Sequence, residues 1–181
     1  MFLIRIHLLL VPVVHHSISS TLVYFHLGSA PGGWTQFLIQ DLKCAKVYSC
    51  DPGELDVKIQ QLDGVKYLQM KSDKAMSYIQ KEQETSSNEL IDLWVSDMCL
   101  SDIEDQVNTF LQAKALGILT LDAFFVLTLK CTTGHSRGTF DDLTKKEIQR
   151  LLGILENPRH VRSYHLFSNR RGERTVMGFA G

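Results

Sequence analysis

The sequence predicts an α/β sandwich whose core is a seven-stranded, mostly parallel sheet that ends in an antiparallel hairpin. Short β-branched and apolar runs alternate with longer amphipathic segments, and this alternation is typical of parallel strands joined by helices. The run at 122–129 (DAFFVLTL) is apolar almost throughout, as expected of a strand covered on both faces. The last two apolar runs are separated only by a short basic turn, which predicts the hairpin.

Seven short segments are predicted as strands because they are rich in β-branched and aromatic residues. In chain order they are 21–25, 46–50, 65–70, 89–96, 122–129, 161–167 and 174–179, with a tight turn at 168–172. Five segments between them have helical spacing: 35–43, 54–62, 73–83, 102–116 and 139–155. In the fourth of these, Ile103, Val107 and Phe110 fall on one face. The polar run 82–88 is predicted as a loop.

Length and composition favour one globular domain over residues 21–181. The chain has 181 residues, of which 44% are hydrophobic and 22% are charged. Residues 1–20 form an atypical N-terminal segment, which contains an early Arg5 and an apolar run broken by Pro12. That run is too short to span a bilayer, so no membrane partner is expected. A signal peptide, a core strand, an amphipathic lead-in and a misassigned gene start are the alternatives for this segment.

Cysteine usage indicates a reducing environment. Cys44, Cys50, Cys99 and Cys131 show neither CxxC nor zinc-binding spacing. We therefore expect reduced thiols, no bound metal and an intracellular protein, with cytoplasm, nucleus and organelle equally compatible. The sequence leaves the oligomeric state open.

Charge is distributed unevenly, although the formal net charge is only −1. Residues 1–129 contain nine Lys/Arg and fifteen Asp/Glu, whereas residues 130–181 contain ten and five. A basic last third favours a local phosphate-binding face, and solvated surface charge is the competing explanation.

The segment 27–34 (LGSAPGGW) is the most informative feature for function. It follows the first predicted strand and opens the first predicted helix, so it forms a glycine-rich turn from strand to helix. Glycines let the backbone approach a ligand closely, and the N–H groups at the start of a helix favour an anionic ligand. The competing explanation is that such a turn only packs a helix against a sheet.

Ligands of parallel α/β sheets bind beyond the carboxyl ends of the strands, so the residues there are candidate site residues. Asp51 follows the second strand, where a carboxylate can accept hydrogen bonds from ribose hydroxyls. A turn-forming Asp before Pro-Gly is the alternative interpretation. Asp97 follows the fourth strand, Lys130 follows the fifth, and Glu173 precedes the last.

Together these motifs resemble the FtsJ/RrmJ-type RNA ribose 2′-O-methyltransferases, a class I family that uses S-adenosylmethionine. The matching segments are LGSAPGGW (27–34), VYSCD (47–51), VSDM (95–98), TLK (128–130) and ERTV (173–176). Segments 46–52 and 164–178 are most similar to the RlmM-type branch, which methylates a ribose of large-subunit ribosomal RNA. The resemblance implies a Rossmann-like class I methyltransferase fold, S-adenosylmethionine as the cofactor, and RNA, in particular ribosomal RNA, as the substrate.

The resemblance also implies roles for individual residues. The family surrounds the substrate ribose with a Lys-Asp-Lys-Glu tetrad, and Asp97, Lys130 and Glu173 match three of its members. Lys130 would remove or polarise the 2′-hydroxyl proton, Asp97 would orient Lys130 or the cofactor, and Glu173 would position the ribose or the lysine. From spacing alone, a surface lysine is the favoured interpretation of Lys130, and an ion pair with a turn arginine that of Glu173; the resemblance reverses this preference. The implied cofactor contacts are Gly28, Ser29, Ala30, Pro31, Gly32, Gly33, Trp34, Asp51, Asp73 and Asp97.

Three positions depart from the family pattern. The first lysine of the tetrad has no counterpart, since no lysine precedes Lys43. His26 stands where the family has an acidic residue that favours the ammonium end of the cofactor, and a protonated imidazole would repel that ammonium. Lys71 stands where an acidic residue near the adenine is expected, with Asp73 as the candidate substitute. These departures leave a second interpretation open, a catalytically inactive family member that binds RNA or a protein partner.

RNA phosphates are expected to contact the basic last third of the chain. The principal candidates are Arg170 and Arg171, in the turn beside Glu173, together with Arg137. Further candidates are Arg159, Arg162 and Arg174, whereas Lys145, Lys146 and Arg150 are better explained as a solvated helix face. A Rossmann-like dehydrogenase is a third interpretation, disfavoured because residues 28–33 are GSAPGG instead of GxGxxG.

Overall fold

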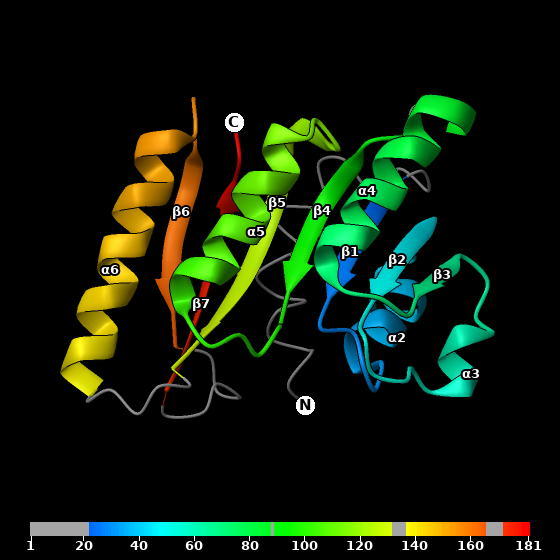
Figure 1. The fold of residues 1–181 in the computed structure, drawn as a ribbon, viewed down its shortest axis with the longest axis horizontal. Coiled ribbons are helices and arrows are strands. Elements are labelled where there is room, and N and C mark those ends of the chain that lie inside the picture. Colours follow the sequence, from blue (N-terminus) through cyan, green and yellow to red (C-terminus); the bar gives the residue numbers. More distant parts are fainter. Residues whose placement is uncertain (1–21, 88, 132–136, 166–171) are drawn as a thin grey trace.

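The computed structural model describes residues 22–87, 89–131, 137–165 and 172–181. Within these residues seven strands form one sheet in the order β3-β2-β1-β4-β5-β7-β6 (Figure 1). The strands are β1 (Val23–Leu27), β2 (Lys46–Cys50), β3 (Val65–Leu68), β4 (Ile91–Ser96), β5 (Leu119–Lys130), β6 (Arg159–Tyr164) and β7 (Glu173–Phe179). The pairs among β1 to β5 are parallel, whereas β7 is antiparallel to both β5 and β6. The predicted class I methyltransferase architecture is confirmed.

Helices lie on both faces of the sheet (Figure 1). They are α2 (Gly33–Gln40), α3 (Val57–Gln60), α4 (Ser72–Glu82), α5 (Ile103–Ala115) and α6 (Arg137–Ile154). Apolar side chains of α4, α5 and α6 pack on one face, where Val107 and Phe110 of α5 are buried as the helical spacing predicts. The other face packs against α2 through Phe37 and Leu38.

β5 is the strand that joins the two apolar layers of the core. Its side chains alternate, with Phe125 and Leu127 in the layer under α4 to α6 and Phe124 and Val126 in the layer under α2. All four are buried, which confirms the prediction of a strand covered on both faces. The segment therefore holds the residues at its carboxyl end on a rigid support.

The polar run 82–88 is the clearest error of the predicted secondary structure. Gln83–Ser87 continue α4 as a π-helical turn instead of a loop. Two side chains stabilise this conformation by satisfying backbone carbonyls. The hydroxyl of Thr85 donates to the carbonyl of Lys81 at 2.8 Å, and Nε2 of Gln83 donates to the carbonyl of Ile118 at 3.1 Å. Such contacts are invisible to hydrophobic periodicity because one partner lies far along the chain.

Other boundaries differ by a few residues. β2 matches its prediction, whereas β1 extends to Leu27 because this residue still pairs with both neighbouring strands. α3 is shorter than the predicted 54–62 and begins where the Asp56 carboxylate accepts a hydrogen bond from the N–H of Lys58 at 2.8 Å. In the described part of the chain, no helix is both long and apolar enough to cross a membrane.

Candidate active site at the carboxyl ends of the strands

The glycine-rich loop between β1 and α2 is held against two neighbouring strand ends. Gly28 has φ +76°, and a Cβ at this position would lie 2.8 Å from backbone atoms of Asp97 and Met98. The N–H groups of Gly28 and Ser29 donate to the carbonyl of Cys50 at 3.1 and 3.3 Å. Only glycine fits the first position, because the loop and the end of β4 approach at backbone distance.

At the start of α2, the backbone of Gly32 is packed against a neighbouring side chain, whereas the space beside Gly33 is open. Gly32 has φ +126°, and a Cβ here would clash with the side chain of Ile59. At Gly33, by contrast, no atom lies within 4 Å of the corresponding Cβ position. The space beside Gly33 at the start of α2 is therefore open, which is compatible with a ligand at this end of the helix.

Asp51 ties the loop after β2 to the glycine-rich loop. One carboxylate oxygen accepts from the N–H of Ala30 at 3.1 Å and the other from the N–H of Gly53 at 2.7 Å. The turn-forming role that the sequence left open is therefore real. It does not exclude ligand binding, because a carboxylate has lone pairs for further hydrogen bonds and this one is only partly buried.

Asp73 lies near the same strand end, in the first turn of α4, and its side chain is exposed. The charge of Asp73 affects the pKa of the nearby Cys50 thiol. Burial raises the pKa of Cys50 to about 12, and the negative charges of Asp51 and Asp73 contribute to the rise. The negative charges of Asp51 and Asp73, from different elements, thus both act on the last residue of β2. The role of Asp73 as a substitute for the acidic residue expected at Lys71 stays a prediction.

His26 belongs to a buried chain of polar side chains beneath the glycine-rich loop. Its Nδ1 lies 3.2 Å from the hydroxyl of Thr35, which lies 2.7 Å from the hydroxyl of Ser49. Burial lowers the pKa of His26 to about 3. The imidazole is therefore uncharged at neutral pH, and the expected repulsion of a cationic ligand is wrong for this conformation. Burial next to an aliphatic sheet, which the residue type alone does not reveal, is the physical reason.

Lys130, Asp97 and Glu173 come together at the end of β5. Nζ of Lys130 lies 3.0 Å from Oδ1 of Asp97 and donates to the Asp97 carbonyl at 2.7 Å. Glu173 pairs with Lys130 in the antiparallel register of β5 and β7. Burial raises the pKa of Asp97, and the nearby Glu173 charge raises it further, while Lys130 and a hydrogen bond from Thr128 oppose the rise. Three residues distant in sequence therefore form one charged cluster.

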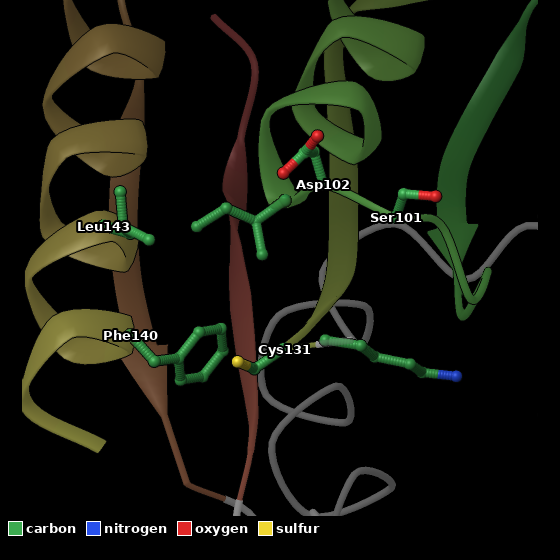
Figure 2. Close-up of a pocket in the computed structure, with 7 residues that line it drawn as sticks. Ser101, Asp102, Cys131, Phe140 and Leu143 are labelled. Carbon is green, nitrogen blue, oxygen red and sulfur yellow. The ribbon is translucent and has the colours of Figure 1, made fainter. Parts of the chain in front are cut away.

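A small hollow adjoins this cluster between α5 and α6. It is lined by Ser101, Asp102, Ile103, Lys130, Cys131, Phe140 and Leu143. Figure 2 shows Phe140 extending from α6 toward the thiol of Cys131, with Leu143 farther along the same helix. Its volume is about 20 Å³, which is room for one water molecule. The hollow is therefore too small to hold a group the size of a sugar ring.

The predicted RNA-binding arginines divide into three groups. Arg170 and Arg171 lie outside the described residues, and so does the side chain of Arg137, whose backbone begins α6. Arg159 and Arg162 are exposed on the edge strand β6. Arg174 is only 8% exposed and pairs with Asp141, so its assignment as a phosphate contact is wrong.

Two residues near the site, Ser96 and Asp141, were not among the predicted site residues. The hydroxyls of Ser29 and Ser96 are buried without a hydrogen-bond partner in the described part of the chain, and only Ser29 was a candidate. Ser96 pairs in register with Leu27, so the two hydroxyls belong to adjoining strand ends. The position of Ser96 before Asp97 was the available signal. Asp141 gave none, because a carboxylate near the start of a helix usually faces solvent.

The sequence matches a family model described as FtsJ-like methyltransferase over residues 13–156. This match covers most of the chain, including the glycine-rich loop, Asp51, Asp97 and Lys130. No curated protein sequence matches the chain.

Solved structures share the fold at low sequence identity. A Streptococcus thermophilus protein described as a hemolysin superposes with a TM-score of 0.68 at 16% identity over 95% of this chain, which spans 64% of that protein. A Plasmodium falciparum protein described as a ribosomal RNA methyltransferase has a TM-score of 0.54 at 16% identity, with 98% of both chains covered. Human methyltransferase-like protein 13, solved in complex with SAH, has a TM-score of 0.58 at 16% identity, covering 98% of this chain and 79% of that one.

Proposed function

The chain belongs to the FtsJ-like methyltransferase family, and from that premise we propose that it transfers a methyl group from S-adenosylmethionine to a ribose 2′-hydroxyl of RNA. The observation that supports this most is the cluster of Lys130, Asp97 and Glu173 at the end of β5. A lysine paired with a carboxylate next to a glycine-rich loop provides both halves of the chemistry, proton handling and cofactor binding. Ribosomal RNA is the proposed substrate class, on the RlmM-like segments of the sequence and the P. falciparum neighbour.

The residues at the strand ends fit S-adenosylmethionine. Open space above Gly33 and the free side of the Asp51 carboxylate supply room and acceptors for an adenosyl group. Among the described residues the buried hydroxyls of Ser29 and Ser96 have no hydrogen-bond partner, and a polar ligand would supply one. The neighbour solved with SAH, the demethylated form of this cofactor, supports the same assignment.

The proposed chemistry requires alignment and the removal of one proton. The cofactor supplies a methyl group on a sulfonium, which is an excellent electrophile, so the 2′-oxygen needs little activation. Lys130 Nζ would accept the hydroxyl proton while the methyl group passes from the sulfur of the cofactor to the 2′-oxygen and S-adenosylhomocysteine is left, and Nζ must be uncharged to do so. Asp97 holds Nζ in place through the 3.0 Å contact, and Glu173 approaches the same group from β7. Together they fix the direction from which the oxygen reacts.

Cofactor binding is testable without an RNA substrate. Calorimetric titration of the purified chain with S-adenosylmethionine should show saturable binding, and Asp51→Asn should weaken it about tenfold because one charged acceptor is lost. Asp56→Asn is the matched control, since Asp56 caps α3 through Lys58 and lies outside the proposed contacts. Equal affinities for wild type and Asp51→Asn would contradict the assignment of Asp51.

Turnover separates the proposed enzyme from an inactive binding subunit. With ribosomal RNA and labelled cofactor, Lys130→Ala should lower the methylation rate about 10²–10⁴-fold while cofactor affinity persists. Lys130→Arg keeps a positive charge but cannot release its proton at ordinary pH, so it should be equally slow. An active Lys130→Arg variant would show that the charge alone suffices and would contradict proton transfer to Lys130. A wild-type chain that binds RNA and cofactor without turnover would establish the binding subunit instead.

A further inference from the structure

Arg174 is an almost fully buried charge immediately next to the proposed catalytic carboxylate. It is 8% exposed and follows Glu173 at the start of β7. Removing a guanidinium from water costs several kcal/mol unless partners replace the lost hydration. An aliphatic side chain would fill the same volume without this free-energy cost of desolvation, so packing alone does not explain an arginine here.

The contacts of Arg174 connect three parts of the site. Its Nη2 lies 2.6 Å from Oδ1 of Asp141 on α6. Its Nη1 donates to the backbone carbonyl of Glu173 at 2.8 Å. The guanidinium carbon lies 5.7 Å from the ring centre of Phe140, which also lines the hollow beside Lys130. One planar group thus fixes the peptide of Glu173 relative to the first turns of α6.

The register of the sheet explains why this peptide matters. Lys130 pairs with Glu173, and Leu129 pairs with Arg174. Beyond them, the N–H of Cys131 donates to the carbonyl of Gly172 at 2.8 Å. Because neighbouring residues of a strand point to opposite faces, holding Arg174 on the α6 side sets the direction of the Glu173 side chain.

We propose that Arg174, held in place by Asp141, is a positioning residue that aims the Glu173 carboxylate at Lys130 and Asp97. The catalytic meaning of this role rests on the proposed methyl transfer, whereas the geometric claim does not. In this role Arg174 acts through Glu173 and requires no contact of its own with cofactor or RNA.

Lysine and amide substitutions test the role without removing volume. Arg174→Lys retains the charge but cannot reach two acceptors in different directions, and Asp141→Asn leaves the arginine but removes its charged partner. Arg150→Lys is the matched control, because Arg150 forms a similar 2.6 Å pair with the buried Glu147 on α6, away from Glu173. Thermal unfolding of all variants identifies any that fail to fold. If only one of Arg174→Lys and Asp141→Asn folds, that variant alone still tests the proposal.

The kinetic measurement separates positioning from general stability. With RNA and S-adenosylmethionine, we expect kcat to fall about 10–100-fold in Arg174→Lys and Asp141→Asn, with cofactor affinity unchanged. Arg150→Lys should keep the wild-type kcat. Wild-type kcat in folded Arg174→Lys, or an equal loss in Arg150→Lys, would overturn the proposal.

A second measurement decides the geometric claim even if the chain proves inactive. Carboxyl ¹³C NMR titration of the protein alone reports the pKa of Asp97, which the Glu173 charge helps to raise. That pKa should fall in Arg174→Lys, since Glu173 is no longer held near Asp97, and it should be unchanged in Arg150→Lys. An Asp97 pKa that is the same in both variants would overturn the positioning role. Absence of wild-type methylation, by contrast, would count only against the proposed function.

Discussion

At the scale of single residues, His26 shows how burial changes the meaning of a substitution. The family pattern has an acidic residue here, and a protonated histidine would invert the charge. In this protein the imidazole is fully buried beside Thr35 and is neutral, so the substitution removes a negative charge without adding a positive one. Cofactor recognition then depends on the polar groups around the loop.

The buried imidazole makes stability depend on pH. An unfolded chain binds a proton on His26 near pH 6.5, whereas the folded protein does so only near pH 3. Lowering the pH between these values therefore favours the unfolded state, and at pH 5 the loss from this residue is about 2 kcal/mol. Urea unfolding at pH 7.5 and pH 5 should show that loss in wild type but not in His26→Gln. An equal loss in both proteins would show that His26 is accessible to protons when folded.

Chain neighbours place Gly28 and Asp51 at strand ends, because Leu27 is the last residue of β1 and Cys50 the last of β2. Their roles as cofactor contacts stay predictions, made for Gly28 from the glycine-rich segment and for Asp51 from its position after a strand. Arg174 was misassigned because its partner Asp141 lies 33 positions away and joins it only through tertiary packing. Sequence spacing carries no information about such a pair.

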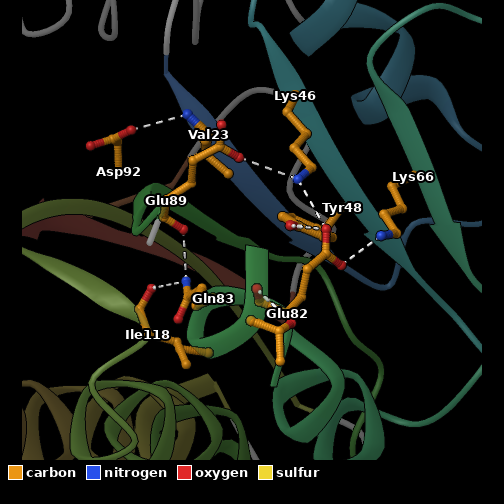
Figure 3. A network of polar contacts seen from close by, with 10 residues as sticks. Val23, Lys46, Tyr48, Lys66, Glu82, Gln83, Glu89, Asp92 and Ile118 are labelled. Atoms are coloured by element: carbon orange, nitrogen blue, oxygen red, sulfur yellow. Dashed lines mark hydrogen bonds and ion pairs between the residues drawn. The ribbon is translucent and has the colours of Figure 1, made fainter. Parts of the chain in front are cut away.

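At the scale of elements, a charged network attaches α4 to the sheet on the side away from the proposed site. Figure 3 shows the Glu82 carboxylate at the end of α4 between Lys46 and Lys66, with the hydroxyl of Tyr48 beside it. The two ammonium groups lie 3.2 and 2.5 Å from the carboxylate oxygens. Burial by itself would raise the pKa of Glu82, but the hydrogen bonds from the lysines lower it to about 2.

Removing the shared carboxylate charge should weaken this attachment. Glu82→Gln is expected to lower the free energy of unfolding at pH 7 by about 1–3 kcal/mol, because two partly buried lysines lose their common partner. The difference from wild type should shrink as the pH falls from about 4.5 toward 2, where Glu82 itself becomes protonated.

Glu89 provides the control for Glu82. It also contacts Lys46, at 3.3 Å, but its side chain is 47% exposed. Glu89→Gln should therefore change the free energy of unfolding by no more than about 0.5 kcal/mol in the same urea experiment. Equal effects of the two substitutions would show that exposure does not decide the strength of these ion pairs.

Elements stabilised by residues close together in the sequence were predicted correctly, whereas one that depends on a distant hydrogen bond was not. Strands and amphipathic helices were found because apolar periodicity reports which side faces the core, as for Ile103 and Val107 of α5. The π-helical turn after α4 was not found, since Gln83 reaches across to Ile118. Local pattern specified the order of the elements, and non-local hydrogen bonds specified where α4 ends.

At the scale of the whole molecule, the surplus of positive charge in residues 130–181 lies in the part of the chain that contributes β6 and β7. Acids outside this segment neutralise part of it, since Lys130 pairs with Asp97 and Arg159 with Asp122. Arg174 is also engaged inside the fold, by Asp141. The arginines expected to meet RNA are therefore fewer than the composition suggests.

The salt dependence of RNA affinity should report how many of these arginines contact phosphates. Replacing Arg137, Arg170 and Arg171 together by Ala should weaken RNA binding at low salt and reduce the slope of log affinity against log salt by about 2. Lys145→Ala with Lys146→Ala, on a solvated face of α6, should leave the slope unchanged. Filter binding or fluorescence anisotropy at several salt concentrations measures both, and an unchanged slope in the triple variant would exclude these arginines as phosphate contacts.

The strand order determines when each strand can join the sheet during synthesis. Among the described strands β6 pairs only with β7, which follows it in the chain and inserts between β5 and β6. During synthesis, β6 therefore leaves the ribosome with no strand to pair with and must wait for β7. Glu173 is the first residue of β7, so the step that completes the sheet also delivers this carboxylate to Lys130. A nascent chain cannot assemble the cluster in advance, and the proposed active site is complete only when β7 docks.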